Sequence, residues 1–433
     1  MAKETTTRRP AYDAVIVGAR CAGAATAMLL SRLGLRVLAV DRGRYGTDTL
    51  STHALMRGGV LQLRRWGVLD RIQAAGTPAV RTTTFHYGDE ALAIAIKPRD
   101  GVDALYAPRR TVLDAALVDA ARDAGAEVEY GVRLSGLLRS STGRVSGIVL
   151  EGPDGNARPI EAGLVVGADG LRSTVARLAG AATYRVGRHA GGVVYGYWSG
   201  LDVDGFHWYF RPGVSAGALP TNGGEACVFV AVPEQRFRDE IRFDVASGFH
   251  RVLAESAPEF ARTLGSGRQS GNFRGFAGEA GFFRQSYGPG WALVGDAGYF
   301  RDPITAHGIT DALRDAELLA RAVARGTDEA LAGYQAGRDA LALGLFEASD
   351  DIASFAWDLP AVQRTHRAMS DEMNREVAAL AALDDPGPAA SPARGADGYR
   401  AASAWRSQAR ARSQSRWAVR SDTPSASAVS CSE

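Results

Sequence analysis

The segment that most constrains the fold is residues 12–41, in which an apolar strand, a glycine-containing turn, a helix and a second strand follow one another. The strand DAVIVG leads into the helical sequence CAGAATAMLLSRLG, and LRVLAVD closes the unit. Strand, helix and strand at this spacing predict a βαβ unit, whose two strands lie parallel in one sheet. The chain therefore opens on an α/β domain.

The turn of this unit has the sequence GARCAG, from Gly18 to Gly23. Directly after a strand and at the start of a helix, such a turn lets backbone N–H groups face a pyrophosphate. Arg20 stands where the dinucleotide-binding pattern has its second glycine, so a tight turn without a ligand is the alternative interpretation. Asp41 ends the second strand, where a carboxylate accepts a hydrogen bond from a ribose hydroxyl. The residues predicted to bind a dinucleotide here are Gly18, Ala19, Ala22, Gly23, Asp41 and Arg42.

The order of the later segments predicts an α/β fold, α+β overall, in which a second sheet interrupts the first domain. A helix over 111–125 leads into a strand over 127–130, and the alternation returns at 291 before a helix over 308–324. Between these parts, β-rich and aromatic segments predict a mostly antiparallel sheet. The predicted parts are a Rossmann-like cofactor domain (10–80, 105–180 and 285–340), a substrate-binding sheet domain (81–104 and 181–284), C-terminal helices (341–384) and a disordered tail (385–433).

Composition narrows the class of protein. With 433 residues and 46% apolar residues, the chain can bury a large core. A net charge of +2 from nearly equal acids and bases argues against a nucleic-acid partner. The N-terminal sequence is polar, and no run of about 18 apolar residues occurs, so we expect a cytoplasmic protein without stable membrane insertion. The cysteines lack metal-ligand spacing, so no metal is expected, and the oligomeric state stays open.

Three segments further along the chain carry motifs: RRTVLDAAL around Arg110, GADGLRS around Asp169, and LVGDAGYFRDPITAHGITDAL from residue 293. Together with the glycine turn, they resemble the glutathione-reductase-like FAD family that includes p-hydroxybenzoate hydroxylase and the geranylgeranyl reductases. The resemblance implies that Arg110 reaches the cofactor, with Arg109 as the alternative. It implies that Asp169 supports the FAD pyrophosphate, with a structural strand end as the alternative. It also implies that Asp296 binds the ribityl chain of FAD.

The resemblance implies that the segment from Pro303 to Thr310 lies beside the isoalloxazine ring. Independently, a helix that begins at Gly308 offers free N–H groups and a dipole that favour negative charge on a reduced flavin. His307 is a candidate proton donor there, although a histidine bonded to the backbone is an equal alternative. The cofactor residues predicted in the later segments are Arg110, Asp169, Asp296, Ala306, His307, Gly308 and Ile309, and the candidate catalytic residues are His307 and the flavin-adjacent Pro303.

From the resemblance we expect an FAD-dependent monooxygenase that uses NAD(P)H. It would hydroxylate or otherwise oxygenate a small aromatic or polyketide-like molecule through a flavin C4a-hydroperoxide. The main alternative is a geranylgeranyl-reductase-like enzyme acting on C=C bonds, and flavin binding without catalysis is a third. A halogenase is the weakest option, because Lys97 is the only lysine beyond the N-terminal segment and the Trp-x-Trp-x-Ile-Pro motif is absent.

The substrate is expected to bind against the inserted sheet, in a mostly apolar pocket. Candidate pocket residues are Tyr195, Tyr197, Trp208 and Thr221, for which an ordinary place in the sheet core is the alternative. The segment DTLSTHAL, with Thr49, Ser51 and His53, falls where the family often lines the substrate side of the flavin, although a plain loop explains it nearly as well.

Overall fold

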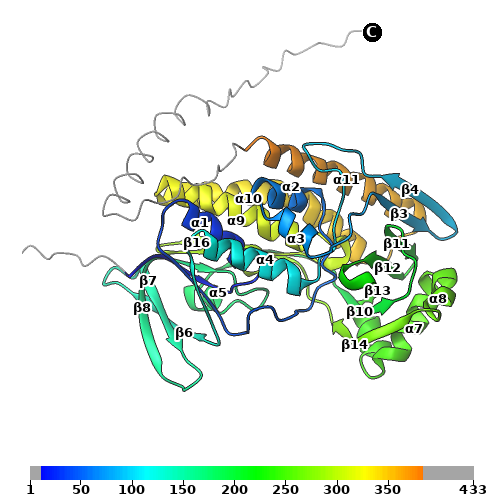
Figure 1. The fold of residues 1–433 in the computed structure, drawn as a ribbon, viewed down its shortest axis with the longest axis horizontal. Helices are drawn as coiled ribbons and strands as arrows, with labels where there is room; N and C mark the ends of the chain where they lie inside the picture. Colours follow the sequence, from blue (N-terminus) through cyan, green and yellow to red (C-terminus); the bar gives the residue numbers. More distant parts are fainter. Residues whose placement is uncertain (1–10, 384–433) are drawn as a thin grey trace, which may run out of the picture. The chain divides into compact units, whose positions relative to one another are not determined.

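The computed structural model describes residues 11–383 (Figure 1). The tail predicted to be disordered, residues 385–433, lies outside the described residues. Within them, the predicted βαβ unit is formed by β1 (Tyr12–Val17), α1 (Cys21–Arg32) and β2 (Val37–Asp41), and β1 pairs with β2 in parallel. The α/β fold class is confirmed, and the elements divide between two large sheets.

The first sheet has eight strands, with β16-β17-β8-β1-β2-β5 in order and β6 and β7 forming a meander into β8. The strands from β17 to β5 are parallel. Beyond β1 and β2, its members are β5 (Glu127–Tyr130), β6 (Arg133–Arg139), β7 (Val145–Glu151), β8 (Ala157–Gly167), β16 (Tyr287–Gly288) and β17 (Trp291–Leu293).

Alternate residues of β1 enter two separate cores, because successive side chains of a strand point to opposite faces. Ala14 and Ile16 pack with α1, α4 (Arg110–Asp123) and α9 (Gly308–Arg325). Val15 and Val17 pack with the meander and α5 (Thr174–Ala179). The side chains of α1 are small and almost fully buried, which lets α4 and α9 lie close to it. This packing brings the N-terminal ends of α1 and α9 to the same edge of the sheet.

The second sheet has seven strands in the order β14-β10-β13-β12-β11-β3-β4. It is antiparallel except where β3 lies parallel to β11. Its members are β3 (Thr82–Tyr87), β4 (Glu90–Ala95), β10 (Gly191–Ser199), β11 (Phe206–Arg211), β12 (Val214–Pro220), β13 (Glu225–Pro233) and β14 (Arg268–Phe276). The mostly antiparallel second sheet therefore draws its strands from both 82–95 and 191–276.

The two faces of this sheet bury different residues. One face is aromatic and includes Tyr195, Tyr197, Phe206 and Trp208. It packs towards residues of α10 (Asp328–Ala353) and α11 (Leu359–Ala381). The other face is covered by α7 (Val245–Ser256) and α8 (Pro258–Leu264). The aromatic face is the one that continues towards the first sheet.

The remaining elements connect these layers. A three-stranded sheet contains β9 (Thr183–Val186), β15 (Phe282–Arg284) and β18 (Tyr299–Phe300). The remaining α-helices of the described residues are α2 (Arg57–Arg65), α3 (Leu69–Ala74) and the short α6 (Glu234–Arg236), which a π-helix at Phe237–Ile241 follows. Single 3-10 turns lie at Asn222–Gly224, Gly295–Ala297 and Pro303–Thr305. The predicted boundary at 340/341 falls inside α10, which packs on α9.

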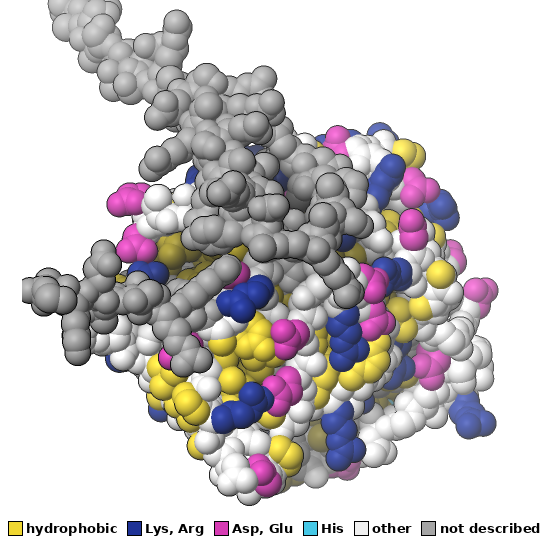
Figure 2. All heavy atoms as spheres, turned by 60° about the vertical axis from the view of Figure 1, so that its left-hand side comes forward, with side chains coloured by type: hydrophobic (Ala, Val, Ile, Leu, Met, Phe, Trp, Pro, Cys, Tyr) yellow, Lys and Arg dark blue, Asp and Glu magenta, His cyan; other side chains and the backbone are white. Residues whose placement is uncertain are grey.

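Charged side chains do not gather in one patch on the face drawn in Figure 2. Figure 2 shows basic and acidic side chains interspersed with apolar ones over the face that it draws. Among the helices of the described residues, none is long and apolar enough to cross a membrane.

Candidate active site

The glycine turn after β1 requires glycine at two positions. Gly18 has a φ of +103°, and a Cβ there would lie 2.3 Å from the carbonyl oxygen of Ala168. A Cβ on Gly23 would lie 1.8 Å from the carbonyl oxygen of Gly18. Arg20 has an extended backbone (φ −94°), which any residue adopts, and its side chain reaches Asp114 at 3.1 Å. The missing second glycine therefore does not distort the turn, and Arg20 makes no side-chain cap on α1.

Asp41 ties the end of β2 to the glycine turn. Its carboxylate accepts hydrogen bonds from the backbone N–H of Ala19 at 2.8 Å and of Gly43 at 2.7 Å. Arg42 follows it and is exposed. A ribose hydroxyl at this strand end would meet a carboxylate that is already oriented by the backbone.

A cavity of about 1050 Å³ extends from the glycine turn to the aromatic face of the second sheet. Most of the residues predicted to bind the cofactor line it: Gly18, Ala22, Asp41, Arg42, Arg110, Asp169, Asp296, Ala306, Gly308 and Ile309. Pro303 and Tyr195 also line it, whereas Ala19 and Gly23 lie in the turn behind the lining. The fold thus brings motifs from four distant parts of the sequence to one cavity.

Asp296 presents an acceptor to this cavity. It lies in the turn Gly295–Ala297, directly after β17. Among the described residues, no side chain or backbone group hydrogen-bonds its carboxylate. Burial and the neighbouring Asp311 raise the pKa of Asp296 to about 7, although Arg110 opposes the shift. Asp296 is partly buried, and such an acceptor without a protein partner is suited to bind a ligand hydroxyl.

The first turn of α9 presents donors to the same cavity. The N-cap residue of α9 is His307, and its side chain makes no cap hydrogen bond to the helix. The N–H groups at the start of the helix are therefore left for another acceptor. Gly308 and Ile309 line the cavity at this point. The helix dipole favours negative charge there.

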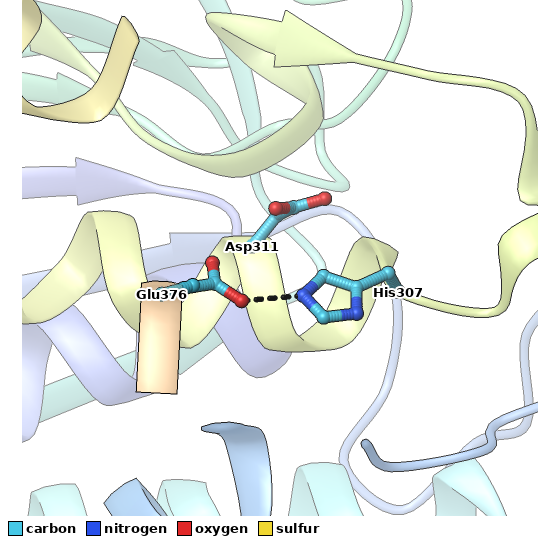
Figure 3. A group of neighbouring side chains, drawn as sticks. All are labelled: His307, Asp311 and Glu376. Carbon is cyan, nitrogen blue, oxygen red and sulfur yellow. Dashed lines mark hydrogen bonds and ion pairs between the residues drawn. The ribbon is translucent and has the colours of Figure 1, made fainter. Parts of the chain in front are cut away.

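The side chain of His307 does not face the cavity. It is 2% exposed, and its Nε2 lies 2.6 Å from Oε2 of Glu376 on α11. The predicted role of a proton donor beside the flavin is therefore not supported by the geometry. Ala306, Gly308 and Ile309 line the cavity. The imidazole of His307 instead points to Glu376 on α11 (Figure 3).

The structure separates the two candidate arginines. Arg110 is buried, lines the cavity, and donates from Nε (3.1 Å) and Nη2 (2.9 Å) to Asp114. Arg109 instead lies over the ring of Tyr197, with 3.6 Å between its Cζ and the ring centroid. Cys21 beside Arg110 is buried, which raises the pKa of its thiol to about 11 and makes it unreactive.

Asp169 lines the cavity but has a structural task. Its carboxylate accepts hydrogen bonds from the hydroxyl of Ser173 at 2.5 Å and from the N–H of Thr174 at 2.6 Å. These bonds fix the start of α5 and the turn beside Gly18. Asp169 therefore has the structural function that was the alternative interpretation of this motif. It would affect a cofactor mainly by fixing the conformation of the loop.

Tyr195 and the segment 49–54 line the part of the cavity where the substrate is expected. The hydroxyl of Tyr195 accepts the backbone N–H of Ser51 at 2.9 Å. Burial raises the pKa of Tyr195, so the hydroxyl keeps a proton that it can donate. The DTLSTHAL segment is thus a wall of the cavity rather than a remote loop.

His53 organises this wall from behind. It is 1% exposed and has a positive φ of 51°. Its Nδ1 lies 3.0 Å from the carbonyl oxygen of Ala107, which only accepts, so Nδ1 donates and Nε2 accepts from the hydroxyl of Tyr197 at 3.1 Å. Burial and the nearby Arg109 lower the pKa of His53 to about 3, so it is neutral. The sequence did not show these bonds, because the partners lie 54 and 144 residues away.

Three residues predicted to form the pocket do not line it. Tyr197 bonds His53, Trp208 donates its indole N–H to Thr83 at 2.9 Å, and Thr221 donates to the carbonyl oxygen of Ala107 at 2.6 Å. All three are buried in the sheet core. Tyr197 and Trp208 thus have the alternative place in the sheet core, and Thr221 directly follows β12. The sequence does not show their distance to the cavity, because it depends on how the two sheets pack.

The parallel sheet, the glycine turn before the uncapped helix α1 and the cavity with the unbonded carboxylate of Asp296 together define a dinucleotide-binding protein. Residues 11–349 match the family of FAD binding domains, which is most of the chain. The chain belongs to this family, and the expected FAD-dependent oxidoreductase is confirmed.

A relative and two solved structures extend the comparison. The chain is 29% identical over 317 residues to digeranylgeranylglycerophospholipid reductase 2 of Methanothermobacter thermautotrophicus, covering 69% of this chain and 74% of the relative. The flavin-dependent brominase Bmp2 superimposes with a TM-score of 0.70 at 17% identity, covering 93% of this chain and 99% of Bmp2. PqsL, a probable FAD-dependent monooxygenase from Pseudomonas aeruginosa, gives a TM-score of 0.69 at 20% identity, covering 84% and 99%. These two structures show a shared fold.

Proposed function

We propose that this FAD-dependent oxidoreductase is a monooxygenase. With NAD(P)H as the electron donor, it would hydroxylate or otherwise oxygenate a small aromatic or polyketide-like molecule. The size and polarity of the cavity are the observation that carries this proposal.

The cavity leaves limited room beside the cofactor. Its volume of about 1050 Å³ only slightly exceeds the roughly 300–1,000 Å³ of a typical single small-molecule site. FAD would occupy much of this volume, from the glycine turn to the first turn of α9. The remaining space between Pro303 and Tyr195 suits a compact substrate better than a long isoprenoid chain.

The wall on the substrate side is polar enough to orient such a molecule. The hydroxyl oxygen of Tyr195 accepts a hydrogen bond from the backbone N–H of Ser51. Its proton can then be donated to a carbonyl or phenolate oxygen of the substrate. A pure hydrocarbon would leave this buried donor without a partner, which costs about 1–3 kcal/mol. The site therefore favours substrates that carry an oxygen acceptor.

The residues present fit FAD. The backbone of the turn from Gly18 to Gly23 would hold the pyrophosphate, Asp296 would accept from the ribityl chain, and the N–H groups at Gly308 and Ile309 would face the pyrimidine edge of the ring. The bound flavin would supply the electron transfer and the oxygen chemistry. The protein would bind and orient the substrate and enclose the reacting atoms.

A reductase acting on carbon–carbon double bonds is the second candidate. The digeranylgeranylglycerophospholipid reductase named above matches the chain over about three quarters of its own length. A halogenase has less support, because Lys97 is exposed at the end of β4 and is not among the residues that line the cavity.

Steady-state turnover separates these candidates. The purified chain would be loaded with FAD and given NADH or NADPH with phenolic, polyketide-like or unsaturated isoprenoid compounds, while NAD(P)H oxidation and oxygen uptake are followed. We expect substrate-stimulated oxygen uptake with an oxygenated product. Oxidation of the reduced flavin by an isoprenoid without oxygen would instead establish the reductase.

A further inference from the structure

A buried network of charges adjoins the cofactor side of the cavity, and two of its members, Arg301 and Asp311, line the cavity. Its carboxylates belong to Asp311, Asp315 and Glu376, and its cations to Arg301 and Arg314. All five side chains are at most 3% exposed. Glu376 is the member that comes from α11, beyond the residues matched by the FAD family.

His307, Asp311 and Glu376 are close enough to suggest a cation site (Figure 3). The hydrogen bonds argue otherwise. Arg314 donates to Asp311 at 2.7 Å and to Glu376 at 2.8 Å, and Arg301 donates to the second oxygen of Asp311 at 3.0 Å. The second oxygen of Glu376 faces His307. All four carboxylate oxygens therefore have partners, and we assign no metal to this group.

The network instead reaches two segments that face the cofactor. Glu376 contacts His307, the residue between the cavity-lining Ala306 and Gly308. Through Arg314 it also connects to Asp315, which accepts the backbone N–H of Gly295 at 3.2 Å. Gly295 precedes Asp296, so one carboxylate on α11 is connected to both the ribityl-side turn and the first turn of α9.

The electrostatics support an ionised Glu376. Burial alone would raise its pKa, but His307, Arg314 and Arg301 together lower the pKa to about 2. Glu376 is therefore an acceptor, so Nε2 of His307 carries the proton in their 2.6 Å contact. Such a charge-assisted hydrogen bond is shorter and stronger than a neutral one and restricts the imidazole to one orientation.

We propose that Glu376 is a positioning residue for FAD, which holds the Gly295–Asp296 turn and the first turn of α9 in place through Arg314 and His307. This inference rests on the proposed placement of FAD in the cavity. The proposal gives α11 an indirect function in cofactor binding. Glu376 itself does not line the cavity and acts through the residues that it holds in place.

The test compares Glu376→Gln and Glu376→Asp with Asp371→Asn, an exposed residue five positions earlier on the same helix. FAD affinity of the full-length apoprotein is measured by flavin fluorescence, and the visible spectrum of the bound flavin is recorded. We expect the Kd for FAD to rise on the order of tenfold in Glu376→Gln, the size typical for loss of a group that orients another. Its bound flavin should also show shifted absorption maxima, while Asp371→Asn stays at the wild-type values.

Glu376→Asp keeps the negative charge, so the proposal can still be tested if Glu376→Gln does not fold. It should show the same two changes, smaller in size, because a shorter side chain keeps one of the two contacts. A third variant, His307→Gln, should not add to the effect of Glu376→Gln if they act in one chain. Wild-type FAD affinity and spectrum in a folded Glu376 variant, even with a lower Tm, would overturn the inference. Retention of FAD by Gly18→Val would instead show that the cofactor site itself is misplaced.

Discussion

The two sides of the cavity are built in different ways. On the cofactor side, the site is formed mainly by backbone groups. They belong to a glycine turn, to the end of a strand and to the start of a helix. On the expected substrate side, side chains of β10 and of His53 form hydrogen bonds with one another and with backbone groups of Ser51 and Ala107. Backbone sites leave a short, local pattern in the sequence, whereas interlocked side chains do not.

The sharpest test of the backbone side is Gly18→Val. The new side chain would collide with the carbonyl oxygen of Ala168 and would require a strained φ of +103°. We expect protein with little or no bound FAD, measured as flavin absorbance per chain after purification in excess FAD. The control is Gly333→Ala, an exposed position in α10 where a Cβ meets no other atom within 4 Å. Equal flavin content in both variants would remove the glycine turn from the site.

Acid should destabilise the fold through two buried histidines, His53 and His366. Burial lowers the pKa of His53 to about 3 and that of His366 to about 4. Because both values lie below the roughly 6.5 of an unfolded histidine, the unfolded chain binds more protons as the pH falls. Each histidine should therefore cost about 1.4 kcal/mol of folding free energy per pH unit from about pH 6.5 down towards its own pKa.

Urea unfolding at several pH values between 7 and 5 measures this loss. In His366→Asn one of the two buried groups is absent, so the free energy of unfolding should depend less steeply on pH. His250→Asn, at an exposed position, should keep the wild-type slope. The same slope in both variants would show that His366 does not contribute to the acid sensitivity.

On the substrate side, Tyr195→Phe should separate turnover from cofactor binding. The variant loses the hydroxyl that faces the cavity but keeps the ring, so the FAD content should not change. For a substrate with an oxygen acceptor, we expect kcat/KM to fall about tenfold, which corresponds to roughly 1.4 kcal/mol. Tyr209→Phe on β11, which does not line the cavity, is the matched control. If Tyr195→Phe lowered only FAD binding, Tyr195 would belong to the cofactor site and not to the substrate site.

The smallest effect is expected for Arg20→Gly. Restoring the second glycine should hardly matter, because the backbone of Arg20 is already extended and its side chain is paired with Asp114. A partly exposed ion pair of this kind contributes about 0–1 kcal/mol. The Kd for FAD should stay within about fivefold of wild type. A much larger change, in either direction, would show that the Arg20 side chain helps to form the phosphate site.

The same contrast explains what the sequence could predict. The βαβ unit, the second sheet and the motifs around Gly18 and Asp296 could be predicted from the sequence, because each depends on a short stretch of residues. The side-chain direction of His307 was not, because it is decided by Glu376, 69 residues away. Thr221 and Trp208 were placed in the pocket although they lie in the sheet core. Strand alternation shows which residues share a face, but it does not show how far that face extends beyond the cavity.

Glu376 had no local signal, and for His53 the sequence indicated a place near the substrate side of the flavin but none of its hydrogen bonds. Each is a polar residue that becomes significant only when packing removes it from water and provides its partners. A search for them would need the fold, because their contacts join α9 with α11 and the segment 49–54 with β10.

The most direct test of the central claim is a single turnover with labelled oxygen. The FAD-loaded protein would be reduced with NAD(P)H without oxygen and then mixed with ¹⁸O₂ and the compound that stimulates oxygen uptake most. We predict a product that carries one labelled oxygen atom per reduced flavin. Unlabelled compound with hydrogen peroxide as the only product, for every member of the panel, would contradict a monooxygenase.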